Sequence, residues 1–210
     1  MKIIYVYDAL CGWCYGFSPV IKQFYQKHRR TVDVEVVSGG MITGSRIGPI
    51  GEVAPYIRQA YKEVEVRTGV TFGKAFLENV LEEGSTIFSS VPPAVALSVF
   101  KSHRTDEAVL FAGALQQAIY YDGLAPEDTA AYASLAEEFG IDGKTLVTQM
   151  KQPTFQEKAQ EDFRKSQQLG VTGFPTVFAE VEETLYPLAR GYTSLSDLEN
   201  RFAELLQKTS

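Results

Sequence analysis

The first fifty residues combine short apolar runs with one helical repeat. Residues 2–7 form an apolar run, and residues 32–36 alternate valine with acidic side chains, as a half-buried strand does. Between these runs, hydrophobic residues recur at helical spacing from Cys11 to about His28. Two parallel strands need such a helical crossover, so the pattern predicts a β-α-β unit.

The middle of the chain, residues 51–168, lacks strand patterns and carries successive helical ones. Thr105 predicts one helix start, and Pro126 with the acidic residues after it predicts another, with the proline at the first helical position. We expect roughly four to six helices and, without a recurring period, no repeat array. Glycines mark the expected helix ends at Gly84, Gly123, Gly140 and Gly170.

Strand patterns return near the C-terminus. Residues 176–180 and 185–189 predict a hairpin, and Ser194 predicts the start of a last helix. The apolar stripe of that helix comprises Leu195, Leu198, Phe202, Leu205 and Leu206.

The order β-α-β, helical block, β-β-α predicts an α/β protein. We expect residues 1–50 and 169–210 to form one domain and residues 51–168 to form an inserted helical domain. With 210 residues, a hydrophobic fraction of 45% and a charged fraction of 22%, the chain can bury a core without disulfides.

Charge and hydropathy limit the cellular locations and the classes of partner that we expect for this protein. The formal net charge is -6, and no basic cluster is interleaved with aromatic residues, so we expect no nucleic-acid partner. The apolar stretch at residues 1–7 is too short for a signal peptide, and no run approaches the length of a membrane span. We therefore expect a cytoplasmic protein without membrane contact.

The two cysteines of the chain, Cys11 and Cys14, lie where the first strand leads into the first helix. Amides at a helix N-terminus stabilise a thiolate, so we expect an exposed, nucleophilic Cys11, with the deeper Cys14 resolving a mixed disulfide. A CxxC motif beside a β-α-β unit indicates redox chemistry. Two alternatives are half of a zinc site, for which His28 and His103 are the only imidazoles, and two incidental buried cysteines.

The segment Asp8-Ala9-Leu10-Cys11-Gly12-Trp13-Cys14-Tyr15-Gly16 resembles the active-site segment of the DsbA family of thiol–disulfide oxidoreductases, in particular its FrnE-like branch. That branch typically has an aspartate three residues before a C-x-W-C motif. The family's architecture is a thioredoxin fold with a large helical insertion between the second and third strands. This architecture is similar to the element order above, so the resemblance covers nearly the whole chain.

The resemblance implies roles for several residues. Cys11 and Cys14 would be the catalytic pair. Pro19 stands where thioredoxins carry a proline that kinks the active-site helix. The bond between Phe174 and Pro175 would be cis and face the cysteines, leaving the backbone before it free to pair with a substrate strand. A proline at an ordinary strand entry is the alternative. Trp13, Phe174 and Pro175 would bind substrate, with Trp13 partly exposed.

Departures from the family pattern bear on whether the cysteine pair oxidises or reduces its substrates. DsbA has a histidine within its CxxC, whereas Gly12-Trp13 supplies no cation. Tyr5 replaces the buried carboxylate that thioredoxin and DsbA carry six residues before the first cysteine. Asp8 is then the nearest acid, and it would cap the helix, which we favour, or accept a proton from Cys14. The missing cation implies a less oxidising pair, which suits a reductase or isomerase in a reducing cytosol.

The expected partners are disulfide-containing or partly folded protein clients and a dithiol or glutathione redox system. We expect no metal and no bound cofactor, with glutathione as a candidate co-substrate. Kappa-class glutathione transferases and hydroxychromene-carboxylate isomerases share the superfamily but use serine at the position of Cys11. A second alternative is a protease adaptor that uses the same fold as a binding module.

The remaining candidates have structural interpretations. His28 and His103 are expected to be surface groups. Four aromatic residues could line a groove above the cysteines, but we favour their packing in the core of the insertion: Tyr56, Tyr61, Phe72 and Phe76.

Overall fold

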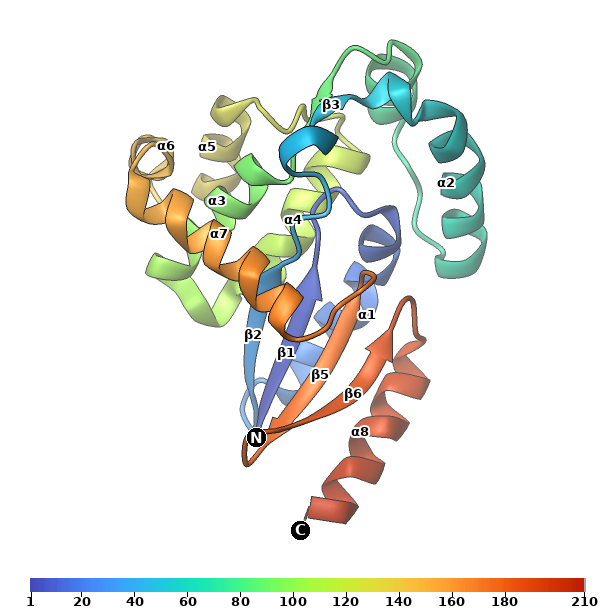
Figure 1. Cartoon of the computed structure of the whole chain (residues 1–210), viewed down its shortest axis with the longest axis vertical. Coiled ribbons are helices and arrows are strands. Elements are labelled where there is room, and N and C mark those ends of the chain that lie inside the picture. The colour runs from blue at the N-terminus through green and yellow to red at the C-terminus, as the bar shows by residue number, and fades with distance from the viewer. Residues whose placement is uncertain (210) are drawn as a thin grey trace.

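A computed structural model describes residues 1–209 and places a four-stranded mixed sheet at the centre of the molecule (Figure 1). The strands lie in the order β2-β1-β5-β6, with β1 and β2 parallel and the other pairs antiparallel. Their bounds are β1 (Lys2–Tyr7), β2 (Asp33–Ser38), β5 (Thr176–Val181) and β6 (Thr184–Arg190). With helix α1 (Gly12–His28) joining β1 to β2, this arrangement confirms the predicted thioredoxin fold and its β-α-β unit.

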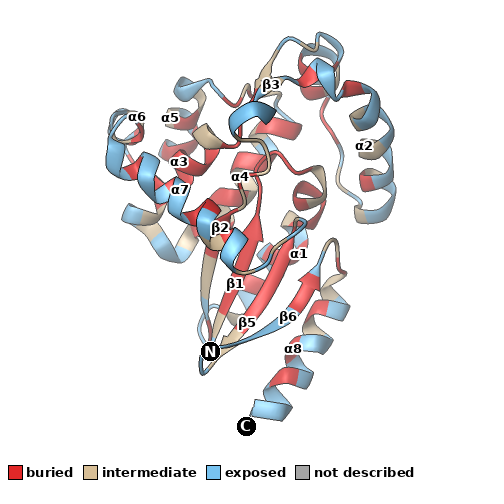
Figure 2. Ribbon diagram, in the orientation of Figure 1, coloured by how far each residue is buried: buried red, intermediate tan, exposed pale blue. Residues whose placement is uncertain are grey.

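Strand β1 is buried on both faces (Figure 2). Its alternation sends Ile3, Tyr5 and Tyr7 into the large core that includes α1, and Ile4 and Val6 into a smaller cluster on the opposite face. Because α1 follows β1 after only four residues, the start of that helix is held against a fully packed strand.

The insertion between β2 and β5 is helical, as predicted. Its helices α3 to α7 gather beside the β2 edge of the sheet, whereas α2 lies on the other side of the molecule (Figure 1). Their bounds are α2 (Ala54–Thr68), the π-helix η3 (Ala75–Glu82), α3 (Val91–Arg104), α4 (Ala108–Tyr120), α5 (Thr129–Glu138), α6 (Gly143–Met150) and α7 (Pro153–Gln168).

Two expectations about the insertion were wrong. A short antiparallel pair joins β3 (Gly48–Pro49) to β4 (Ile87–Phe88), although the sequence shows no strand pattern there. Such two-residue strands are too short to show a periodicity. Helix α5 begins at Thr129 rather than at Pro126, because Asp128 is its N-cap and its side chain accepts a hydrogen bond from the Ala130 amide.

The predicted helix ends are confirmed by positive φ angles at Gly84, Gly123, Gly140 and Gly170. Helix α8 (Leu195–Thr209) starts after Ser194, whose hydroxyl oxygen accepts a hydrogen bond from the Asp197 amide. Its buried stripe is narrower than predicted, since Leu206 is 40% exposed. Among the described residues, no helix has the length and apolarity that a bilayer crossing requires.

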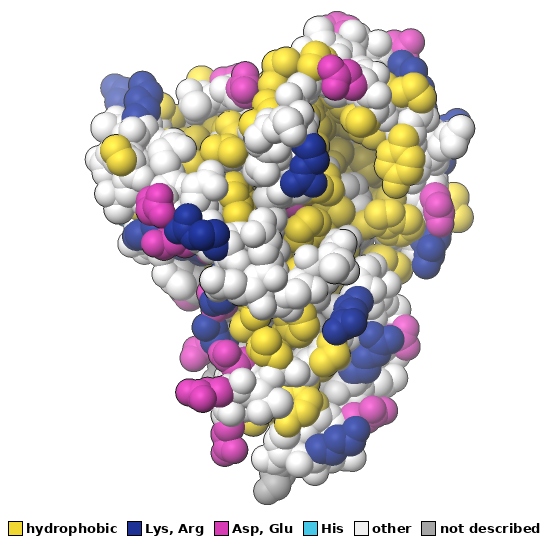
Figure 3. All heavy atoms as spheres, viewed as in Figure 1, with side chains coloured by type: hydrophobic (Ala, Val, Ile, Leu, Met, Phe, Trp, Pro, Cys, Tyr) yellow, Lys and Arg dark blue, Asp and Glu magenta, His cyan; other side chains and the backbone are white. Residues whose placement is uncertain are grey.

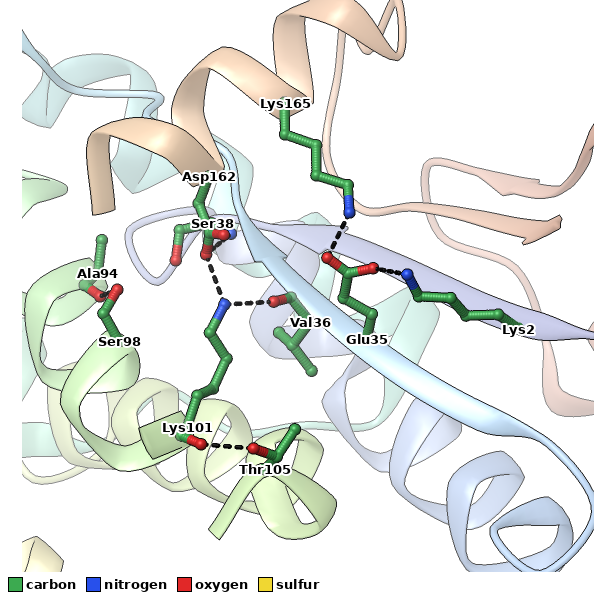
Figure 4. A network of polar contacts seen from close by, with 10 residues as sticks. All are labelled: Lys2, Glu35, Val36, Ser38, Ala94, Ser98, Lys101, Thr105, Asp162 and Lys165. Carbon is green, nitrogen blue, oxygen red and sulfur yellow. Dashed lines mark hydrogen bonds and ion pairs between the residues drawn. The ribbon is translucent and has the colours of Figure 1, made fainter. Parts of the chain in front are cut away.

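An ion-pair network fastens the insertion to β2 (Figure 4). The Lys101 ammonium on α3 donates to Asp162 Oδ2 on α7 at 2.8 Å and to the Val36 carbonyl on β2 at 3.0 Å. The Ser38 amide donates to the same Asp162 oxygen at 3.1 Å. The network therefore joins two helices of the insertion to the edge strand of the sheet.

Candidate active site

The two thiols lie at the junction of β1 and α1, as the sequence predicted. Cys11 is the N-cap residue of α1, with an extended backbone and no side-chain cap. Its carbonyl accepts hydrogen bonds from the amides of Cys14 and Tyr15 at 3.0 and 3.1 Å. The Cys11 sulfur therefore lies at a helix N-terminus, where backbone amides favour a thiolate.

Both thiols are free, and both are largely buried. Cys11 keeps 7% of its surface exposed and Cys14 none, so Cys11 is the more accessible of the two thiols, as expected. The expectation that Cys11 itself is exposed was wrong. Burial raises the pKa of the Cys14 thiol well above its usual range, and the adjacent Cys11 thiol is the second cause. Only Cys11 is accessible to a substrate in this arrangement.

Phe174 and Pro175 face the cysteine pair. The bond between them is cis, which confirms the prediction, and the Phe174 carbonyl accepts a hydrogen bond from the Cys11 thiol at 3.6 Å. Pro175 is buried and Phe174 is half-buried. The backbone that precedes the proline therefore lies beside the Cys11 sulfur.

An apolar pocket of about 270 Å³ opens beside Cys11, between the start of α1 and helix α2. Figure 3 shows hydrophobic side chains gathered in a hollow beside α2. Trp13 is half-buried, as expected, and the Arg67 guanidinium lies 5.1 Å from its ring centroid. The walls include Trp13, Met41, Tyr56, Tyr61, Phe72 and Tyr120.

The interpretation of the four aromatics as core residues was right only in part. Phe76 and Phe72 are buried in the core, although Phe72 also lines the pocket, whereas Tyr61 lines the pocket half-buried and Tyr56 lines it with 70% of its surface exposed. The position of α2 beside the β1–α1 loop brings them to Cys11, and no local sequence pattern specifies that position.

Asp8 does not cap α1 with its side chain, so the favoured interpretation was wrong. The Asp8 backbone carbonyl accepts from the Cys11 amide at 3.1 Å, while its carboxylate accepts from the Leu10 amide, the Met41 amide and the Ser90 hydroxyl. Tyr5 is buried in the same core cluster as the two cysteines, and its hydroxyl has no hydrogen-bond partner among the described residues.

The two histidines lie away from the pocket. The prediction of a surface group was wrong for His28, whose half-buried ring packs against Phe24 and Phe202 with its Nε2 atom 3.0 Å from Glu199. His103 is exposed and lies beside Gln149. Within residues 1–209, no group of three or more His, Cys, Asp or Glu side chains forms a candidate metal site.

Comparisons with known proteins agree with this geometry. The family model described as the DSBA-like thioredoxin domain matches residues 2–203. No curated protein matches the sequence.

Solved structures match over the whole chain. A Nitrosomonas europaea protein, provisionally described as a protein disulfide isomerase, is 25% identical with a TM-score of 0.88, and 100% of each chain is covered. The cytosolic disulfide reductase DsbM from Pseudomonas aeruginosa is 25% identical with a TM-score of 0.82 over 99% of each chain, and it has also been solved with GSH. A 2-hydroxychromene-2-carboxylate isomerase, 15% identical with a TM-score of 0.68, covers 99% of this chain and 97% of its own and shares the fold.

Proposed function

The chain belongs to the DSBA-like thioredoxin domain family of thiol–disulfide oxidoreductases, and on that premise we propose that it reduces or isomerises disulfides through Cys11 and Cys14. One observation carries the proposal. The Cys11 sulfur lies at the N-terminus of α1, beside an apolar pocket and the Phe174 carbonyl, with Cys14 buried one turn behind it.

The proposed reaction proceeds in two exchanges. The Cys11 thiolate attacks one sulfur of the substrate disulfide, forms a mixed disulfide and releases the other substrate sulfur as a thiolate. Cys14 then loses its proton and attacks the Cys11 sulfur, which breaks the bond to the substrate and leaves Cys11 and Cys14 oxidised. A dithiol system or glutathione reduces the pair again.

The direction of the redox reaction and the cellular location of the protein are also proposals. The similarity to DsbM, a cytosolic disulfide reductase solved with GSH, supports a reducing role in the cytoplasm with glutathione as co-substrate. The segment from Asp8 to Gly16 supports placement in the FrnE-like branch. We propose no metal or bound cofactor, because two thiols supply the complete electron transfer.

The pocket indicates how clients would bind. Trp13, Tyr56 and Phe72 offer apolar surface, and the backbone beside Phe174 and Pro175 offers hydrogen-bonding groups for an extended strand. We propose that apolar segments of partly folded proteins occupy the pocket while their disulfide reaches Cys11.

The test compares two single variants after exposure to disulfide-bonded insulin. Cys14→Ser removes the resolving thiol, so it should accumulate mixed disulfides through Cys11. Cys11→Ser should trap almost nothing and should lose reductase activity. Non-reducing gels and intact-mass measurement distinguish these results, and equal trapping by both variants, or by neither, would contradict the mechanism.

A protease adaptor and a glutathione-dependent isomerase are the two alternatives to this mechanism. A protease adaptor would use the apolar pocket without chemistry, so client binding would survive the loss of both thiols. A glutathione-dependent isomerase shares the fold, but the cysteine at position 11 stands where those enzymes use serine. Retention of both thiols favours disulfide exchange.

A further inference from the structure

Asp8 is a buried carboxylate at the centre of the active-site framework, with 1% of its surface exposed. Its Oδ1 atom accepts hydrogen bonds from the Leu10 amide at 3.0 Å and the Ser90 hydroxyl at 2.9 Å. Its Oδ2 atom accepts from the Met41 amide at 2.7 Å. These donors belong to three separate segments: the β1–α1 loop, the loop after β2 and the start of α3.

This environment fits an ionised carboxylate. A carboxylate only accepts hydrogen bonds, and two backbone amides that can only donate, together with one hydroxyl, surround it. Burial raises the pKa of Asp8 above its usual range, and the hydrogen bonds from the Met41 and Leu10 amides, the Ser90 hydroxyl and the Gly40 backbone offset this rise only in part. Within residues 1–209, no Lys, Arg or His side chain forms an ion pair with Asp8. Its charge is therefore stabilised by neutral donors alone.

The charge lies close to the thiols but does not contact them. The Cys11 amide donates to the Asp8 carbonyl, and Cys14 follows one helical turn later. Among the described residues, no hydrogen bond joins the Asp8 carboxylate to either sulfur. Asp8 affects the pKa of Cys14 in two opposite ways, both smaller than the effects of burial and of the Cys11 thiol: a hydrogen bond from the Asp8 backbone lowers this pKa, and the charge of the Asp8 carboxylate, the smaller of the two effects, raises it. Asp8 is thus placed to act on Cys14 through its field, and its oxygens are already occupied by donors.

We propose that Asp8 is a fixed negative charge that disfavours the Cys14 thiolate and so prolongs the mixed disulfide on Cys11. The proposal rests on the disulfide exchange proposed above. In the affected step, the Cys14 thiol loses its proton to solvent and its sulfur bonds to the Cys11 sulfur. The substrate sulfur then leaves with the electron pair of the broken bond and takes up a proton. A longer-lived mixed disulfide gives a client time to attack it with a second thiol, which favours isomerisation over reduction.

Other titratable groups face Asp8 from the surrounding elements. Cys14 lies on α1, Tyr7 on β1 and Tyr120 on α4, and the charge of Asp8 contributes to a raised pKa at each of them. Burial is the first cause for the two tyrosines and raises the pKa of each well above its usual range. Asp8 is therefore the negative charge with which the Cys14 thiolate must coexist.

The test separates the two exchanges in time. Reduced enzyme is mixed with substoichiometric dithiobis(nitrobenzoate), and stopped-flow absorbance follows the release of two nitrothiolates. The first release reports formation of the mixed disulfide on Cys11, which tests the proposed function. The second reports resolution by Cys14, which tests the role of Asp8. The two proposals can therefore fail separately.

Asp8→Asn should move the pH midpoint of the second release downward by roughly one unit, making resolution about threefold faster near neutral pH, because the tenfold gain in thiolate is partly offset by its lower nucleophilicity. The first release should keep its midpoint. A slower second release would overturn the proposal in favour of Asp8 as proton acceptor. Equal rate changes in both releases, with unmoved midpoints, would also overturn it, because they would show a merely structural role. Glu78→Gln, an equal charge change at an exposed residue, should leave both midpoints unmoved.

A measurement on the unaltered protein covers the case in which Asp8→Asn does not fold. The asparagine amide would face the Met41 or Leu10 amide, donor against donor. The ¹³C shift of the Asp8 carboxyl carbon reports its ionisation directly. It should remain that of a carboxylate at neutral pH before and after resolution, and a carboxyl group that is protonated at neutral pH would refute the fixed charge.

Discussion

At the residue scale, the contact between Gly39 and Phe174 positions the carbonyl group that faces the Cys11 sulfur. A Cβ atom at Gly39 would lie 2.2 Å from the Phe174 ring, so the ring packs directly on the glycine backbone. The carbonyl of the same Phe174 lies 3.6 Å from the Cys11 sulfur. The absence of a side chain at position 39 therefore permits the position of the Phe174 backbone beside Cys11.

Gly39→Ala should displace the Phe174 ring and with it the carbonyl beside Cys11. A displacement of about 1 Å in the groups around a reacting atom can slow the reaction by about a hundredfold. We therefore expect kcat/KM for insulin reduction to fall roughly ten- to hundredfold. The matched control is Gly173→Ala, where an added Cβ meets no atom within 4 Å. Stopped-flow or steady-state turnover measures both variants. Equal activity of the two would show that the Phe174 ring position does not matter for turnover.

The residues that could be predicted are those whose role depends on local sequence. The CxxC pair and Pro175 lie at defined places in a familiar order of elements, so their positions agree with the prediction, while their roles stay predictions. The hydrogen bonds of Asp8 were not predictable, because Met41 and Ser90 are 33 and 82 residues away along the chain. The burial of Cys11 likewise depends on distant segments, since Phe174 lies 163 residues away.

At the scale of elements, Lys101 connects α3 and α7 to the edge strand β2. Its side chain is 22% exposed and that of Asp162 is 12% exposed, so water screens this ion pair only in part. Lys101 also donates to the Val36 carbonyl, which would otherwise be an open acceptor on the sheet edge. The ion pair therefore both attaches the insertion and covers the edge strand.

Lys101→Met should destabilise the protein by about 2–3 kcal/mol, because Asp162 and the Val36 carbonyl lose a charged donor in a poorly solvated place. Urea unfolding followed by circular dichroism measures this change. Arg58→Met is the control, since Arg58 and Glu82 form an exposed pair with side chains 45% and 73% accessible. It should change stability by less than about 0.5 kcal/mol. Similar losses in both variants would contradict the anchoring role of Lys101.

The elements themselves were predictable to different degrees. Strands β1, β5 and β6 and helix α1 follow clear periodicities and agree with the sequence prediction within a few residues. The position of α2 was not predictable, because its amphipathic pattern does not specify which part of the protein it packs against. For that reason the pocket aromatics were interpreted as core residues.

At the scale of the whole molecule, the two predicted domains share one hydrophobic core. A single buried cluster contains Phe17 of α1, Phe111 of α4 and Leu198 of α8. The rings of Phe100 and Phe111 stack within it at 4.0 Å. The division at residues 51–168 stays a prediction about sequence organisation, and the continuous core packs the two parts against each other.

The shared core predicts that the whole chain unfolds in one cooperative transition. Two probes report on different parts of the molecule. Trp13 is the only tryptophan of the chain and lies at the start of α1, whereas far-ultraviolet circular dichroism is dominated by the helices of the insertion. If the core holds both parts together, urea titrations followed by Trp13 fluorescence and by circular dichroism should have the same midpoint and slope.

An insertion that folds independently would instead lose its circular dichroism at a urea concentration that leaves the Trp13 signal unchanged. Thermal unfolding by calorimetry provides a second check, because the calorimetric and van't Hoff enthalpies agree only when the core unfolds as one unit.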